Sequence, residues 1–243
     1  MLQSAAAPVT LNPENPISVM QRVEMKYILN ARQTAALLRG LEGHMVADAF
    51  GLTSIASLYY DTPDRRLIRA SLEKPPFKEK LRLRSYGPAS ETSPVFLELK
   101  RKANGTVYKR RVRSTIPAVE QFFAGEAEAP DGQIDRELAA FRDYYDNLAP
   151  ACLIIYDRTA YYEPDGELRL TIDANPRYRT ERLDLTSGLD GIPLLPQGSA
   201  ILEIKVQSAV PLWLTRILSK EKIYQASFSK YGEAYKREIL NVS

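Results

Sequence analysis

The chain has 243 residues, with 33 Lys or Arg against 30 Asp or Glu, so its formal net charge is only +3. This small excess excludes a protein that coats nucleic acid through its overall charge, and any basic site must come from local clustering. The only cysteine, Cys152, excludes an intrachain disulfide and a multi-cysteine metal site, and the single His44 excludes a His-rich zinc site.

The N-terminal residues carry no recognisable targeting or membrane signal. Residues 1–19 are rich in Pro, Asn and Ala and lack the basic start and apolar core of a signal peptide, so we expect a flexible leader. No stretch approaches the roughly 18 consecutive apolar residues of a membrane span. The sequence therefore predicts a cytoplasmic protein in which residues 20–243 form a single domain.

Periodicity and capping signals predict about eight strands and four to six helices. In chain order they are a strand at 22–29, a helix at 31–41, a strand at 53–60, a helix at 64–72, strands at 77–86, 94–102 and 106–113, helices at 118–124 and 134–147, strands at 151–163, 167–174 and 200–206, a helix at 211–220 and a last helix ending near residue 240. Several strands form hairpin pairs, and the Asn104-Gly105 turn is the clearest hairpin signal.

The strand at 77–86 has the most unusual pattern. Lys78, Lys80, Arg82 and Arg84 recur at every second position, so all four cations lie on one face of the strand. Like charges on one face repel each other, which predicts either open solvent or a bound polyanion. Other predicted strands also carry an apolar face and a charged face, which leaves two arrangements open. The charged faces lie outside, or a closed barrel turns them inward and its apolar faces pack under the helices.

Eight motifs occur in the order found in the VTC domain, the polyphosphate polymerase domain of the vacuolar transporter chaperone complex. They are RVEMKY (22–27), SLYYDTPD (57–64), KLRLRSYG (80–87), VFLELKRK (95–102), YDRTAYY (156–162), LRLTID (168–173), ILEIKV (201–206) and FSKYGEAY (228–235). The chain resembles a free-standing bacterial version of this domain, which belongs to the CYTH or triphosphate tunnel metalloenzyme superfamily. The resemblance implies an α+β fold in which a closed antiparallel eight-stranded β-barrel, with surrounding helices, has a polar, basic interior.

The resemblance also implies a set of site residues, matched motif to motif. Phosphate-binding catalytic roles fall on Lys26, Arg82, Arg84, Lys100, Arg158, Arg169 and Lys230. Supporting substrate contacts fall on Tyr156, Ser229, Lys109, Lys205 and Lys80. Metal binding, with Mn²⁺ or Mg²⁺, falls on Glu203 and, with a less defined role, on Glu24.

The activity that the resemblance implies is transfer of the γ-phosphoryl group of ATP, or another nucleoside triphosphate, to a polyphosphate chain. Phosphoryl transfer depends mainly on positioning and charge neutralisation, which Arg and Lys supply. Hydrolytic relatives open with E-x-E-x-K, whereas Arg22 makes this motif R-x-E-x-K, as in the polymerase branch. Hydrolysis of tripolyphosphate or a nucleoside triphosphate and a non-catalytic binding module remain the alternatives, and ATP cyclisation is less favoured because no base-recognition motif is found.

The expected partners are ATP or another nucleoside triphosphate, pyrophosphate and polyphosphate, with no nucleic acid and with room for a membrane partner protein. The last predicted helix carries Lys230, and we expect Phe228 and Tyr231 to pack it against one end of the tunnel as a lid. Tyr27, Tyr59 and Tyr60 are interpreted as aromatics that pack the barrel.

Overall fold

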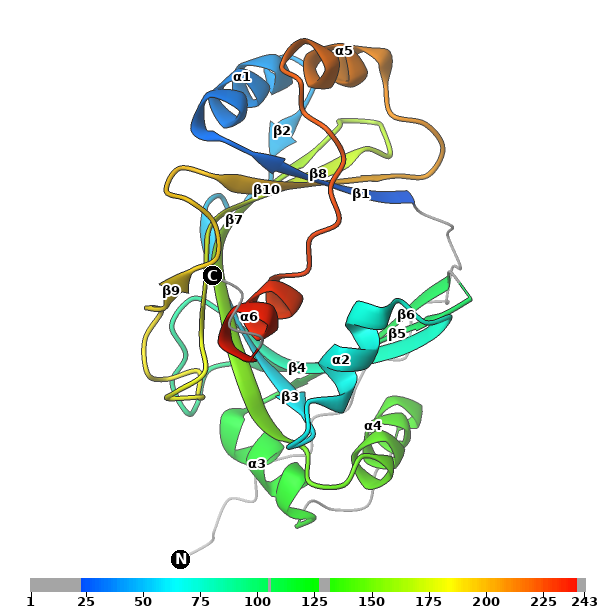
Figure 1. Cartoon of the computed structure of the whole chain (residues 1–243), viewed down its shortest axis with the longest axis vertical. Helices are drawn as coiled ribbons and strands as arrows, with labels where there is room; N and C mark the ends of the chain where they lie inside the picture. The colour runs from blue at the N-terminus through cyan, green and yellow to red at the C-terminus, as the bar shows by residue number, and fades with distance from the viewer. Residues whose placement is uncertain (1–22, 105, 127–131, 240–243) are drawn as a thin grey trace, which may run out of the picture.

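The computed structural model describes residues 23–104, 106–126 and 132–239 (Figure 1). In chain order the elements are β1 (Val23–Leu29), α1 (Ala31–Leu41), β2 (Val46–Ala47), β3 (Thr53–Asp61), α2 (Arg66–Glu73), β4 (Phe77–Tyr86), β5 (Val95–Ala103), β6 (Thr106–Ser114), α3 (Ile116–Ala124), α4 (Gln133–Tyr144), β7 (Ala149–Tyr162), β8 (Arg169–Arg179), β9 (Ile192–Pro193), β10 (Ala200–Val206), α5 (Leu212–Lys220) and α6 (Lys230–Ile239). All fourteen predicted elements are present, and only the two-residue strands β2 and β9 were not predicted. The predicted leader, residues 1–19, lies outside the described residues.

The strands form one antiparallel sheet, which confirms the α+β class. Eight strands follow the order β1-β10-β8-β7-β3-β4-β5-β6, while β2 pairs with β7 and β9 with β8. The sheet bends from β1, β10 and β8 through β7 and β3 to β4, β5 and β6 (Figure 1). Register shifts in β3 between Tyr59 and Tyr60, and in β7 between Ile155 and Asp157, occur where the sheet bends, as β-bulges favour.

Closure of the sheet into a barrel is not confirmed. The strands β1 and β6 are the two ends of the pairing path, and no pairing joins them within the described ranges. The bend nevertheless gives the sheet an inner face, toward α6, and an outer face, toward α1, α3, α4 and α5 (Figure 1). The sequence left open whether the charged faces of the strands lie outside or inside. In the structure they lie on the inner face of the sheet, and the apolar faces lie under the outer helices.

Two apolar clusters cover the outer face, one under each pair of helices. Leu81 and Leu83 of β4 are buried against Phe141 of α4 and neighbouring side chains, because they alternate with the cations of the inner face. At the other end of the sheet, Leu37 of α1 and Leu214 of α5 pack on β1, β8 and β10. Across the part of the chain that the structure describes, no helix has both the length and the apolarity that crossing a membrane requires.

A third apolar cluster lies on the inner face and holds α2 and α6 there. Tyr231 of α6 and Ile68 of α2 pack with Ile154 and Tyr156 of β7. The Asp61 carboxylate accepts hydrogen bonds from the backbone N–H of Ile68 at 3.0 Å and from the Tyr231 hydroxyl at 2.9 Å. One buried carboxylate therefore ties the start of α2 to α6, and the predicted packing of Tyr231 is confirmed.

Candidate functional site

Cations from seven strands and one helix meet on the inner face. The strands contribute Lys26 (β1), Lys205 (β10), Arg169 (β8), Arg158 (β7), Lys80, Arg82 and Arg84 (β4), Lys100 (β5) and Lys109 (β6), and α6 contributes Lys230. Although four strands separate β1 from β4 in the pairing order, the charge of Lys26 interacts with that of Lys80. The bend of the sheet therefore brings these predicted site residues around a shared space.

Glu98 of β5 is the common partner of three of these cations and of Arg111 of β6. Its Oε2 lies 2.7 Å from Arg82 Nε and 3.8 Å from Arg84 Nε, and its Oε1 lies 2.7 Å from Lys109 Nζ and 3.3 Å from Arg111 Nε. Its side chain is only 1% exposed. Burial alone raises the pKa of Glu98, but Arg82 and Arg84 outweigh it and lower that pKa to about 2. The ionised cluster carries four positive charges and one negative charge, a net charge of +3.

Neutral side chains fix the two arginines of β4. Arg84 donates to the Tyr156 hydroxyl at 3.2 Å and to Ser57 Oγ at 3.3 Å, and Arg82 donates to the Tyr59 hydroxyl at 3.1 Å. The ring of Tyr59 also stacks on Tyr231 at 4.8 Å, in line with the packing role expected for it. Burial raises the pKa of Tyr59, but the charges of Arg82 and Lys80 lower it to about 8. Tyr59 thus belongs to the charged site as well as to the packing of α6.

A second buried carboxylate, Asp173 of β8, joins β7 to α6. Its two oxygens accept from Arg158 Nε at 2.6 Å and Nη2 at 2.8 Å, and it also forms an ion pair with Lys230. Lys230 Nζ lies 4.2 Å from the centre of the Tyr156 ring. Burial alone raises the pKa of Asp173, but Lys230 and Arg158 lower it to about 2. The predicted phosphate ligands Arg158 and Lys230 are therefore held in place by an anion within the protein.

On β1 and β10 the charges alternate. Lys26 lies opposite Glu203, and Glu24 lies opposite Lys205. Lys205 Nζ lies 2.8 Å from Glu203 Oε1, and Lys26 Nζ lies 3.3 Å from Glu24 Oε1. Burial raises the pKa of Glu203, but Lys205 and Lys26 lower it to about 2, so this carboxylate is ionised.

These carboxylates fit a shared metal ion better than a closed metal cage. No group of three or more His, Cys, Asp or Glu side chains that could hold a metal ion occurs among the described residues. Thr171, opposite Glu203 in the sheet, has a buried hydroxyl that finds no hydrogen-bond partner among the residues that the structure describes. Glu203, Glu24 and this hydroxyl would leave most positions around a Mg²⁺ or Mn²⁺ ion to phosphate oxygens and water, as Mg²⁺ prefers.

The remaining predicted residues have fewer partners. Lys80 donates to Ser229 Oγ at 3.1 Å, and burial together with nearby Lys100 lowers its pKa to about 8. Lys100 is exposed and lies between Lys80 and Lys109 in the register of β4, β5 and β6. Arg169 is exposed; it donates to the Leu168 carbonyl oxygen at 3.2 Å, and its guanidinium carbon lies 5.4 Å from the centre of the Tyr162 ring of β7.

Sequence reasoning missed four members of the site: Glu98, Asp173, Ser57 and Arg111. Alternation placed Glu98 on the face of Lys100, and Asp173 on the face of Arg169, which was the available signal. Their role as counter-charges depends on which strands pair. Glu98 lies opposite both Arg82 and Arg111, and Asp173 lies opposite Arg158.

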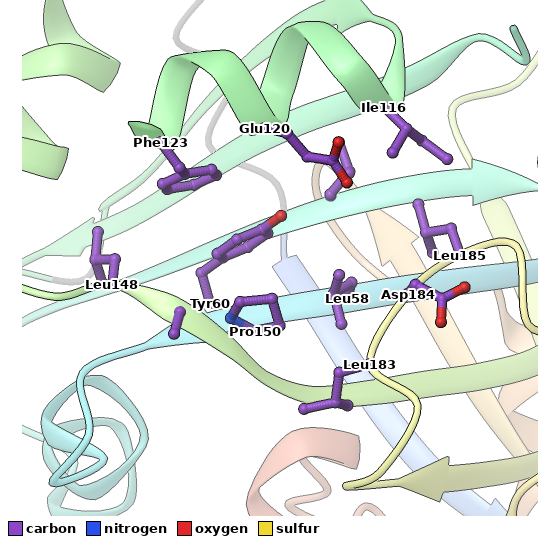
Figure 2. A pocket seen from close by; sticks show the side chains of 12 residues that line it. Leu58, Tyr60, Ile116, Glu120, Phe123, Leu148, Pro150, Leu183, Asp184 and Leu185 are labelled. Carbon is purple, nitrogen blue, oxygen red and sulfur yellow. The ribbon is translucent and has the colours of Figure 1, made fainter. Parts of the chain in front are cut away.

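A separate hollow lies on the outer side of the sheet. It has a volume of about 260 Å³ and is lined mainly by apolar side chains, among them Leu58, Leu83 and Leu148 (Figure 2). Tyr60 stacks on Phe123 at its wall, with ring centres 4.2 Å apart. None of the inner-face cations lines it, so this hollow is distinct from the charged site.

Comparison with known proteins gives one family and several similar folds. The family model of the VTC domain matches residues 21–239. A candidate adenylate cyclase from Bacillus halodurans is 15% identical with a TM-score of 0.56, covering 90% of this chain and 97% of its own. A candidate adenylyl cyclase from Hippeastrum, described as having a dominant triphosphatase activity, is 17% identical with a TM-score of 0.50, covering 89% of this chain and 95% of its own. No curated protein matches the sequence. At these identities the two structures establish a common fold.

Proposed function

The chain belongs to the VTC domain family, and from this premise we propose that it is a metal-dependent polyphosphate polymerase. It would transfer the γ-phosphoryl group of ATP, or of another nucleoside triphosphate, to the end of a polyphosphate chain. The observation that carries this proposal is the cluster around Glu98, where four cations share one buried carboxylate and leave a net charge of +3. A triphosphate carries about four negative charges, so it matches this excess.

The chemistry needs no side-chain nucleophile. A terminal oxygen of the polyphosphate chain attacks the γ-phosphorus, a new P–O bond forms, and the bond to the β-phosphate oxygen breaks to release the nucleoside diphosphate. Arg82 and Arg84, fixed by Glu98, Tyr59 and Tyr156, present guanidinium groups that can bind phosphate oxygens in pairs. Because these groups are already oriented, they stabilise the transferring phosphoryl group with little reorganisation.

Glu203 and Glu24 would hold the divalent ion against the substrate. When bound, Mg²⁺ or Mn²⁺ supplies further neutralisation of the phosphate oxygens. Lys26 and Lys205, which contact these carboxylates, would neutralise them when no ion is bound. The predicted tunnel belongs to this proposal as well, since the bend of the sheet supports a polyphosphate chain passing along the inner face.

Hydrolysis of a triphosphate is the second candidate. The same inner face would bind the substrate, and the structural relative from Hippeastrum is described as a triphosphatase, although it is similar in fold alone. Only two carboxylates, Glu24 and Glu203, lie near the proposed metal position among the described residues, whereas the inner face carries many more cations. This excess of cations favours retention of a long anion over activation of water. This balance supports the polymerase as the first candidate.

The test is to incubate the purified protein with ATP and Mn²⁺ or Mg²⁺, with and without pyrophosphate as primer, and to measure polymer and orthophosphate separately. Long polymer that is lost in Glu203→Gln supports the polymerase. Orthophosphate without polymer supports the hydrolase. Tight triphosphate binding with neither product supports a binding module.

A further inference from the structure

Two consecutive cross-strand pairs on the inner face consist of lysines alone. Lys78 lies directly opposite Lys102, and Lys80 lies directly opposite Lys100, where β4 pairs with β5. Like charges directly opposite each other destabilise a sheet. The next pair along the same strands, Arg82 with Glu98, combines opposite charges. The inner face therefore changes along β4. At one end a carboxylate balances a cation, as in the pair Arg82 and Glu98. At the other end lysine faces lysine, and we call this the uncompensated end.

The outer face of the same two strands gives an internal comparison. There Glu79 lies opposite Arg101, and the two form an ion pair to which Tyr145 adds a hydrogen bond at 2.9 Å. On the outer face, where only folding is concerned, β4 and β5 thus pair a carboxylate with a cation. The unmatched lysines are confined to the face that carries the phosphate-binding cluster.

Four lysines gather at the uncompensated end. Besides Lys78, Lys100 and Lys102, there is Lys74, which ends α2 in a left-handed conformation with φ of 56°. Burial, followed by the charges of Lys102, Lys74 and Lys100, lowers the pKa of Lys78. No ion pair joins any of the four to a carboxylate in the described ranges, and the nearest hydrogen-bonding partner of Lys78 Nζ is the Ser71 carbonyl oxygen, at 3.5 Å.

We propose that Lys74, Lys78, Lys100 and Lys102 form a second polyanion subsite, which binds the polyphosphate chain where it leaves the Glu98 cluster. This inference rests on the proposed function, because it assumes that the Glu98 cluster holds a triphosphate. From Arg84 to Lys78, β4 extends about 20 Å at ~3.3 Å per residue, which is longer than three linked phosphates. The chain would therefore run from the arginines of β4 toward the start of that strand.

The double variant Lys78→Gln/Lys102→Gln tests this subsite by binding alone. We expect roughly tenfold weaker binding of long-chain polyphosphate in titration calorimetry, because two ion contacts are lost, and an unchanged affinity for tripolyphosphate. The slope of log affinity against log salt should fall by about 0.7 per lost contact, as for single-stranded polyanions. The control is Lys220→Gln/Lys222→Gln, whose exposed lysines lie at the end of α5 on the outer side.

Stability provides an independent measurement on the same variants. Removing Lys78 and Lys102 relieves repulsion, so the midpoint of thermal unfolding without anion should rise, and it should not rise in the control. Equal loss of long-chain and tripolyphosphate affinity, or no loss of either, would overturn the subsite. Lysine-dependent binding of single-stranded RNA as tight as that of polyphosphate would also overturn it. The protein could also make no polymer and yet bind long-chain polyphosphate more weakly in the double variant. This result would sustain the subsite and reject only the polymerase.

Discussion

Glu98 shows how one side chain can organise a site built to bind an anion. A buried carboxylate with a single cation would serve folding, whereas Glu98 shares its two oxygens among Arg82, Arg84, Lys109 and Arg111. Its charge reduces the repulsion among these cations without cancelling it. The cations are thus held in a fixed arrangement while most of their charge remains for a substrate.

Glu98→Gln should destabilise the protein, because it removes the only negative charge among four cations at nearly constant volume. The depressed pKa of Glu98 corresponds to a loss of about 2–3 kcal/mol in the free energy of unfolding. Urea unfolding measures this loss, and added tripolyphosphate should restore part of it by binding only the folded state. Glu120→Gln, an exposed position on α3, is the control. Equal stability of both variants with the parent protein would contradict this role.

The affinity for tripolyphosphate should fall as pH rises through about 8. Both Lys80 and Tyr59 have a pKa near 8, and each loses a proton above it, so the positive charge of the site decreases on both counts. Titrations of binding between pH 7 and pH 9.5 would measure the effect, with roughly tenfold weaker binding at the upper end. Lys80→Arg should shift most of this loss to higher pH, since Arg stays protonated. Equal pH profiles for the parent and Lys80→Arg would contradict the assignment to Lys80.

Among the elements, the strands were predictable because their alternation is local. The face of β4 that carries Lys78, Lys80, Arg82 and Arg84 follows directly from its spacing. The cap of α1 is equally local, with Asn30 Oδ1 accepting from Gln33 N at 2.9 Å. The pairing of β5 with β4 and β6, which gives Glu98 its partners, depends on long-range register that one sequence does not reveal. The predicted roles of these residues in phosphate and metal binding stay predictions.

Helix α6 completes the site because the start of the helix brings two polar residues, one on either side of its first position, to the inner face. Lys230 pairs with Asp173, and Ser229, just before the helix, accepts from Lys80. The hydroxyl of Tyr231 bonds to Asp61, which also caps α2. The predicted lid is held by an apolar cluster, by the Lys230–Asp173 ion pair and by several hydrogen bonds. Tyr231 donates to Asp61, Tyr178 donates to Glu238 of α6, and Arg237 donates to backbone carbonyl oxygens beside β9.

Tyr231→Phe should loosen α6 and leave the sheet folded. The variant loses the bond to Asp61, at a cost of about 1 kcal/mol, because this carboxylate keeps its bonds to backbone N–H groups of α2. Faster hydrogen exchange of the α6 amides and severalfold weaker tripolyphosphate binding are the expected results. Tyr224→Phe, at a residue that is 75% exposed, is the control. Faster exchange with full affinity would separate α6 from substrate binding.

At the scale of the whole molecule, the outer helices and the inner charges depend on each other. The apolar clusters under α1 and α5 and under α3 and α4 stabilise the curved sheet from outside. This arrangement leaves the inner face free to carry charges that contribute little to the core. The stability of the protein therefore depends on three buried or half-buried carboxylates, Glu98, Asp173 and Glu203.

The protein should therefore lose stability in acid. Each of these three carboxylates has its pKa lowered to about 2 in the folded state, so each contributes stability that is complete above its ordinary pKa. This stability declines as pH falls from about 4.5 toward 2, by roughly 2–3 kcal/mol for each group. Unfolding free energies measured by urea denaturation from pH 7 to pH 3 would follow the decline. A flat profile across this range would contradict the ion-pair account of the inner face.

The most direct test of the account is calorimetric titration of tripolyphosphate into Arg82→Ala and Arg110→Ala. Arg82 lies on β4 and Arg110 on β6, on opposite faces of the sheet and with β5 between them. Each pairs with a glutamate, Arg82 with Glu98 and Arg110 with Glu137. Loss of one charge-assisted bond pair predicts roughly 10- to 100-fold weaker binding for Arg82→Ala, with parental affinity for Arg110→Ala. Equal affinities in the two variants would show that the inner face is not where the triphosphate binds.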